Sequence, residues 1–222
     1  MNLKQIFKSV VKPFKVRYDS WTHRNRGAFT FENISVNILP EVYSPKIHSS
    51  TVQFVTYLKS INLELKTVLE LGCGTGLISA FCANKGALVT ASDINDEALR
   101  ELAVQSRNNH WNIISVYSDL FENLHFHFDY ILINPPIKTE QTQSRLEFGN
   151  FAGIDFDYFQ RLFSQLRTRD LEKTEVLMFL PEETELFSIN RKASEHYLKL
   201  KTVKVIRKGL GSGTVYRVVL DS

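Results

Sequence analysis

Cysteine is scarce in this chain of 222 residues: Cys73 and Cys82 are the only two. They do not form a Cys-x-x-Cys pair, so we expect no disulfide framework and a reducing, cytoplasmic setting. Long apolar runs are missing as well, because no stretch approaches the ~20 residues that a membrane span needs. The N-terminus lacks the continuous apolar region of a secretory signal. The sequence therefore predicts a cytoplasmic protein without a membrane span.

A large excess of one charge is also missing. The 27 Lys and Arg residues against 24 Asp and Glu give a net charge of +3, which falls short of the electrostatic footprint of a dedicated nucleic-acid binder. The apolar content of 43% is ordinary for a globular protein, and the length suits one domain with an appendage. We divide the chain into a basic segment (1–26), a hairpin-and-helix element (27–62) and a main domain (63–222).

The segment 1–26 carries apolar residues at helical spacing with lysines on its other faces. The apolar residues are Leu3, Ile6, Phe7, Val10 and Val11. A basic amphipathic helix of this kind can lie on nucleic acid or on a membrane surface. It can equally dock on its own domain with the lysines in solvent. Contact with nucleic acid through this segment is therefore one open alternative.

The stretch from Val68 to Gly76 reads Val-Leu-Glu-Leu-Gly-Cys-Gly-Thr-Gly, and a helical pattern follows at once. A glycine lacks Cβ, so a ligand can approach the main chain closely there. The N–H groups and the positive end of the following helix are then expected to face the ligand. The third glycine comes one residue earlier than in the G-x-G-x-x-G of dinucleotide folds, which argues against a pyrophosphate ligand.

Two further signals follow in order along the chain. A strand over 88–92 ends at Asp93, about 20 residues past the glycine loop, where a doubly wound sheet places an acid for ribose hydroxyls. A buried strand then ends in Asn134-Pro135-Pro136-Ile137. Consecutive prolines fix φ and remove two N–H donors, which leaves a rigid turn with outward carbonyl acceptors.

In this order the motifs resemble the Rossmann-like S-adenosylmethionine (SAM) methyltransferases of the Asn-Pro-Pro-Tyr, or small-methyltransferase, type, and in particular the release-factor glutamine N-methyltransferases. The resemblance implies an α/β fold, a doubly wound, mostly parallel seven-stranded sheet with an N-terminal β-hairpin and helix. It implies SAM as the cofactor. The cofactor-binding residues that it implies are Glu70, Gly72, Cys73, Gly74, Gly76, Asp93, Ile94, Asp119, Leu120 and Asn134.

The resemblance also implies how a methyl group is transferred. Asn134, Pro135 and Pro136 are the expected catalytic residues, because the Asn134 oxygen and the Pro135 carbonyl can accept both N–H bonds of a planar nitrogen. This orients the nitrogen lone pair toward the methyl group and stabilises charge that develops on nitrogen. These three residues and Ile137 are expected to bind the acceptor.

The sequence departs from the family at two places. Ile137 stands where the family usually has an aromatic residue, and Phe148 or Phe151 could substitute for that ring. His48 stands where an acidic residue is common. His125 and His127 lack a third nearby ligand, so we predict no metal site.

Three functions stay open: methylation of a protein glutamine, methylation of an exocyclic amino group of an RNA base, and SAM binding without transfer.

Overall fold

The computed structural model describes residues 27–39, Val42, 50–137, Ala152, 154–208 and 211–221. The side chains of 154, 208 and 211 are not described. The predicted basic helix in 1–26, His48, Phe148 and Phe151 all lie outside the described residues.

The described chain alternates strands and helices after an N-terminal hairpin. In chain order the elements are β1 (Gly27–Phe31), β2 (Ile34–Ile38), α2 (Ser50–Leu58), β3 (Thr67–Leu71), α3 (Leu77–Asn84), β4 (Leu88–Asp93), α4 (Asp96–Asn109), β5 (Ile113–Tyr117), β6 (Tyr130–Ile133), a 3-10 turn (Ile154–Phe156), α5 (Asp157–Leu166), β7 (Glu175–Pro181), α6 (Leu186–Ser194), β8 (Leu198–Lys208) and β9 (Gly211–Leu220).

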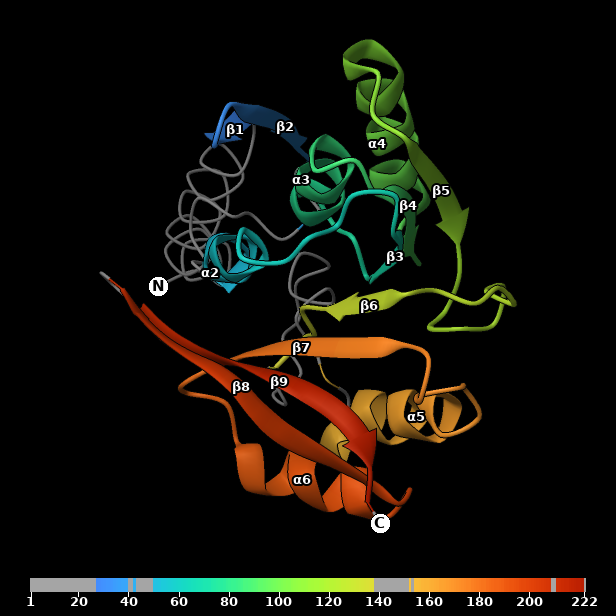
Figure 1. Cartoon of the computed structure of the whole chain (residues 1–222), viewed down its shortest axis with the longest axis vertical. Coiled ribbons are helices and arrows are strands. Elements are labelled where there is room, and N and C mark those ends of the chain that lie inside the picture. The colour runs from blue at the N-terminus through green and yellow to red at the C-terminus, as the bar shows by residue number, and fades with distance from the viewer. Residues whose placement is uncertain are drawn as a thin grey trace, which may run out of the picture.

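The main sheet has seven strands in the order β5-β4-β3-β6-β7-β9-β8 (Figure 1). The first five are parallel, and β9 runs antiparallel to both of its neighbours. The predicted doubly wound, mostly parallel seven-stranded sheet is thus confirmed. From β3 the chain adds β4 and β5 on one side, and from β6 it adds β7 on the other, with β8 at the edge and β9 inserted between β7 and β8. The crevice at the carboxyl ends of β3 and β6 is therefore the topological switch point, where such sheets bind ligands.

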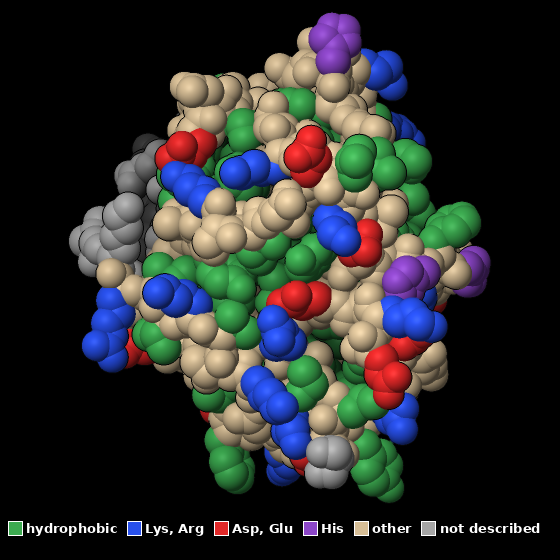
Figure 2. Space-filling view, viewed as in Figure 1, with side chains coloured by type: hydrophobic (Ala, Val, Ile, Leu, Met, Phe, Trp, Pro, Cys, Tyr) green, Lys and Arg blue, Asp and Glu red, His purple; other side chains and the backbone are tan. Residues whose placement is uncertain are grey.

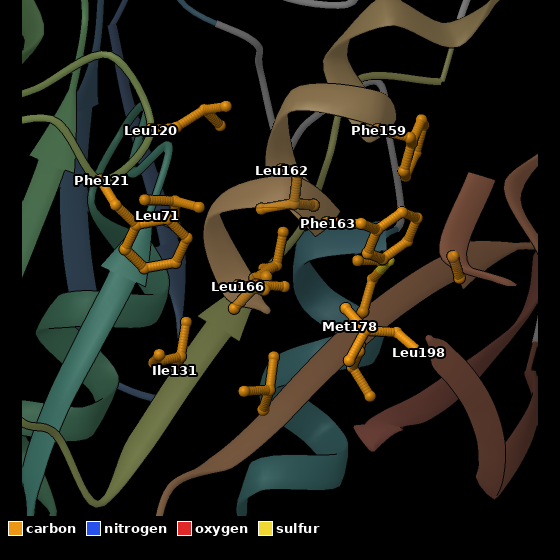
Figure 3. Close-up of a cluster of buried hydrophobic side chains, with 14 of the residues drawn as sticks. Leu71, Leu120, Phe121, Ile131, Phe159, Leu162, Phe163, Leu166, Met178 and Leu198 are labelled. Atoms are coloured by element: carbon orange, nitrogen blue, oxygen red, sulfur yellow. The ribbon is translucent and has the colours of Figure 1, made fainter. Parts of the chain in front are cut away.

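Helices cover both faces of the sheet. One face packs on α2, α3 and the β1–β2 hairpin, and the other packs on α5 and α6. The apolar residues of α5 recur at helical spacing, so they fall on one side of the helix. These residues (Phe159, Leu162, Phe163 and Leu166) are completely buried and lie between the helix and the strands that carry Ile131 and Met178 (Figure 3). They form the buried stripe by which α5 packs on the sheet.

The N-terminal hairpin that the resemblance implies is present, and β8 and β9 form a second hairpin. Glu32 and Asn33 form the turn between β1 and β2 with φ of 52° and 64°, which suits a two-residue hairpin turn. The β2 side chains Ile34 and Val36 are buried in the same core cluster as α2 and α3. The hairpin and α2 therefore pack on the main domain. At the other end of the chain, β8 and β9 pair over their whole length, from Leu198 with Leu220 to Lys208 with Gly211.

Candidate functional site

The predicted site residues lie where four neighbouring parallel strands end. The glycine loop follows β3, and Asp93 is the last residue of β4. Asp119 is the second residue after β5, and Asn134 is the first residue after β6. Because these strands are adjacent and parallel, their carboxyl ends share one edge of the sheet. The fold therefore brings together four motifs that are spread over more than a quarter of the sequence.

The glycine loop is tied to the end of β4. The N–H groups of Gly72 and Cys73 both donate to the Ser92 carbonyl at 2.9 Å, and the Gly74 N–H donates to Asp93 Oδ2 at 2.8 Å. A Cβ built on Gly72 would meet nothing within 4 Å, so that stretch of backbone borders open space. A Cβ on Gly76 would lie 2.4 Å from a Leu102 methyl group. Gly72 thus leaves room beside the loop, whereas Gly76 is required by packing.

Asp93 is held by backbone donors on both oxygens. Oδ2 accepts the Gly74 N–H and Oδ1 accepts the Asn95 N–H at 2.9 Å. Burial raises the pKa of Asp93, and these backbone hydrogen bonds oppose that shift. Each carboxylate oxygen keeps a second lone pair for a hydroxyl donor. Asn95 caps α4 by accepting from Glu97 N and Ala98 N, so Asp93 is not needed for that role.

Ile94, the residue after Asp93, is 63% exposed. After the neighbouring strand β5, the Asp119 carboxylate lies next in the chain to the Leu120 N–H group. Asp119 Oδ2 accepts from Arg161 Nη2 at 2.6 Å. Leu120 has a φ of 50°, and its N–H meets no acceptor among the residues that the structure describes. Its side chain is only 6% exposed and packs with Leu71 and Phe121 (Figure 3), so its predicted contact with a ligand ring stays a prediction.

Glu70 lies beneath the glycine loop and is 3% exposed. It shares its face of β3 with Val68, toward α3, and its Oε2 accepts the Ser79 N–H at 2.8 Å and the Ser79 hydroxyl. One of the helix N–H groups that we expected to face a ligand is therefore taken by Glu70. The structure gives Glu70 a supporting role inside the loop, and its direct contact with a cofactor stays a prediction.

Burial of Glu70 predicts how the stability of the protein depends on pH. Burial raises the pKa of Glu70 from 4.5 to about 8, against the lowering effect of the Ser79 hydrogen bonds and with a smaller raising effect from Asp93. Between these two pKa values the folded state keeps a proton that the unfolded state has lost. The free energy of unfolding therefore falls with rising pH, by at most about 1.4 kcal/mol per pH unit from this group.

We expect Glu70→Gln, which stays neutral, to flatten that part of the pH profile. The variant should gain stability relative to wild type as the pH rises from about 5 to about 8. Urea denaturation of both proteins at several pH values measures the difference. A constant difference between the two proteins across this range would contradict the assignment to Glu70.

The Asn134 side chain is oriented by the first turn of α2. Its Nδ2 donates to Thr51 Oγ1 at 3.2 Å and lies 3.4 Å from Ser50 Oγ. Both hydroxyl residues are less than 9% exposed. With the amide nitrogen held in this way, Oδ1 is left as an acceptor, beside the buried Pro135 and the half-buried Pro136 and Ile137. Sequence reasoning missed Ser50 and Thr51, although a run of hydroxyl residues opening a helix was visible.

The site is polar but has no reactive nucleophile among its predicted residues. Burial raises the pKa of Cys73 and of Cys82 well above the ordinary thiol value, so both are neutral thiols. Within the described ranges, no cluster of three His, Cys, Asp or Glu side chains could hold a metal ion. The same ranges contain no helix long and apolar enough to cross a membrane. The arrangement is suited to binding and orienting reactants.

Comparisons with known proteins bear on the family to which the chain belongs. Residues 33–150 match the family model described as the methyltransferase small domain. The chain is 40% identical over 124 residues to the "Putative protein N5-glutamine methyltransferase" of Methanocaldococcus jannaschii, a match that covers 54% of this chain and 60% of the relative. It is 31% identical over 151 residues to the ribosomal RNA small subunit methyltransferase C of Buchnera aphidicola, which covers 66% of this chain and 42% of that relative.

A solved structure shares the fold at low sequence identity. The T. thermophilus 16S rRNA N2 G1207 methyltransferase, in complex with AdoMet and guanosine, matches with a TM-score of 0.59 at 14% identity. The match covers 86% of this chain and 49% of that one. The chain thus spans between about two fifths and three fifths of the length of these curated relatives.

Proposed function

The chain belongs to the methyltransferase small domain family, and on that premise we propose that it transfers a methyl group from SAM to a planar nitrogen, with a protein glutamine as the first candidate acceptor. The observation that carries the proposal is the orientation of Asn134. Its amide nitrogen is held by Thr51 and Ser50 at the switch point of the sheet, which leaves its oxygen for an incoming N–H. A turn that served only the fold would not need a buried pair of hydroxyls for this side chain.

The residues around the glycine loop fit the adenosine half of SAM. Asp93 would accept hydrogen bonds from the two ribose hydroxyls, because its oxygens are fixed by Gly74 and Asn95 and keep free lone pairs. Asp119 offers an acceptor and the Leu120 N–H a donor, which matches the amino group and N1 of adenine. The open space beside Gly72 gives the rest of the molecule a path along the loop.

The acceptor nitrogen is positioned rather than deprotonated in advance. The amide lone pair is delocalised, so the two N–H bonds accepted by Asn134 Oδ1 and the Pro135 carbonyl turn it toward the methyl group and stabilise the positive charge that forms. The sulfonium supplies an electrophilic methyl group when SAM is bound. A nitrogen–carbon bond forms as the sulfur–carbon bond breaks, and the nitrogen then loses a proton to solvent. Ile137 can cover one face of the acceptor but offers no π surface.

Glutamine is favoured over an RNA base by the relative with the higher identity, whose printed name is that of a protein glutamine methyltransferase. The described surface gives little support to RNA binding, because several of its basic side chains are paired with acidic ones. Arg217 is paired with Glu175 at 2.5 Å and Lys199 with Asp221 at 2.8 Å. On the face in Figure 2, Lys and Arg side chains stand among acidic and apolar ones. Two observations support an RNA base as the acceptor: the ribosomal RNA methyltransferase relative and the basic segment 1–26.

We also propose a cytoplasmic location, since neither cysteine has a partner.

One pair of experiments tests the proposal. Calorimetry with SAM and with S-adenosylhomocysteine measures cofactor binding, and incubation with methyl-labelled SAM plus separated protein and RNA pools identifies the acceptor. We expect binding of both and label in protein, at glutamine by mass spectrometry. Label in RNA alone would replace the proposed acceptor with a base amino group. Binding without label in either pool would favour a SAM-binding protein without transfer.

A further inference from the structure

Helix α5 places two side chains at the adenosine end of the site that its core role does not explain. Tyr158 and Arg161 are three residues apart, so they lie on the same side of the helix. Arg161 contacts the Asp119 carboxylate, and the charges of Asp93 and Asp119 act on Tyr158.

Arg161 binds Asp119 directly. Its Nη2 lies 2.6 Å from Asp119 Oδ2 and 3.8 Å from Glu122 Oε1. Asp119 holds the pKa of Arg161 above its ordinary value. The Arg161 and Asp119 side chains are 42% and 41% exposed, and an ion pair as open to solvent as this adds little to stability. What the contact does is occupy one oxygen of Asp119 and leave Oδ1 for another donor.

Tyr158 is close enough to both acids of the site to feel their charges. Burial raises the pKa of Tyr158, and the charges of Asp93 and Asp119 raise it further. Its ring packs edge-on against Phe159, with 5.3 Å between the ring centroids. Tyr158 therefore packs against the core beside Arg161, and the direct contact between α5 and the site is that of Arg161 with Asp119.

We propose that Arg161 is a positioning residue that makes the site selective for adenine. It holds Asp119 Oδ2 so that Oδ1 faces the exocyclic amino group, while the neighbouring Leu120 N–H faces N1. Adenine presents a donor and then an acceptor on this edge, whereas hypoxanthine presents an acceptor and then a donor. Without Arg161, the half-exposed carboxylate loses its fixed orientation and must be ordered when the ligand binds. This inference rests on the proposed function, because it assumes that the site holds adenosine.

The test compares two ligands that differ only on that edge, S-adenosylhomocysteine and S-inosylhomocysteine. Wild type should prefer the first, and Arg161→Met, which keeps the length of the apolar stem, should weaken its binding by about tenfold while leaving S-inosylhomocysteine unchanged. Arg161→Lys keeps the charge and should restore part of the preference. Arg100→Met is the matched control, because Arg100 pairs with Asp96 on the exposed side of α4 and should leave both affinities unchanged.

The outcomes separate this inference from the proposed function. If wild type binds neither ligand, the proposed function fails and the role of Arg161 fails with it. If wild type prefers adenosine and Arg161→Met keeps the same ratio of affinities, only the role of Arg161 is overturned. A loss of equal size for both ligands would also overturn it, since a general effect on the site does not depend on the base edge. Melting curves for every variant confirm that the fold is intact.

Discussion

Asn134→Ala should lower kcat for methyl transfer by about a hundredfold to a thousandfold, with the affinity for S-adenosylhomocysteine kept within about threefold. The reason is that the Asn134 oxygen acts most strongly when the acceptor nitrogen gains positive charge. Removal of one preoriented group of this kind has a cost of that order in other enzymes. Single-turnover methylation and calorimetry on the same preparations measure the two quantities. Full activity in the variant would rule out the proposed mechanism.

Thr51 provides a second and more selective variant for the same mechanism. Thr51→Val removes the hydroxyl that accepts from Asn134 Nδ2 at 3.2 Å and keeps the shape of the side chain. We expect about a tenfold fall in kcat and no change in cofactor binding, because only the orientation of the amide is disturbed. Thr56→Val is the matched control: its hydroxyl donates to the Val52 carbonyl within α2 and does not contact Asn134. Equal effects in the two variants would mean that α2 was damaged generally.

Much of the fold could be predicted because its signals are local in the chain. The hairpin turn at Glu32–Asn33 and the cap at Asn95 depend on residues within a few positions of each other. The strand ends at Asp93 and Asn134 followed from short apolar runs that end in a polar residue. Since parallel strands share a carboxyl edge, four local patterns were enough to predict one common site.

The missed features arise from side chains that are distant in sequence. Arg161 is 42 residues from Asp119, and Thr51 is 83 residues from Asn134. A single sequence has no pattern that pairs them. Helix α6 was also missed, because only Ile189 and Ala193 of its residues are buried and its N-cap side chain makes no capping bond. In strand β8, which runs from Leu198 to Lys208, a register shift between Thr202 and Lys204 interrupts the alternation that a sequence pattern would show.

Glu70 has a structural contact that the sequence did not predict, while its predicted contact with the cofactor stays a prediction. The resemblance implied that it binds the cofactor. In β3 it alternates with Leu69 and Leu71, which face α5, so its own side chain points toward α3 and meets Ser79. The sequence shows that Glu70 and its neighbours alternate between the two faces of the sheet. It does not show which helix covers each face, so it could not predict the contact with Ser79.

Alanine should cost more stability at Gly76 than at Gly72, although both glycines belong to the same loop. Gly76 has a φ of 74°, and a Cβ there would lie 2.4 Å and 2.9 Å from the two methyl groups of Leu102, which is 1% exposed. Strain in φ and overpacking together should cost about 2–4 kcal/mol of the free energy of unfolding. Gly72 has a φ of 75° but open space beside it, so Gly72→Ala should cost only about 1 kcal/mol.

The order of effects should reverse for ligand binding. The new methyl group at Gly72 would enter the space proposed for the cofactor and should weaken S-adenosylhomocysteine binding by about a hundredfold or more, because overlap with backbone-close ligand atoms cannot be relieved by a side-chain rotation. Urea denaturation and calorimetry on both variants separate the two losses. Gly76→Ala combined with Leu102→Ala should recover part of the stability that the two single changes lose together, since the clash is removed. Normal binding by Gly72→Ala would mean that the cofactor does not lie against this part of the loop.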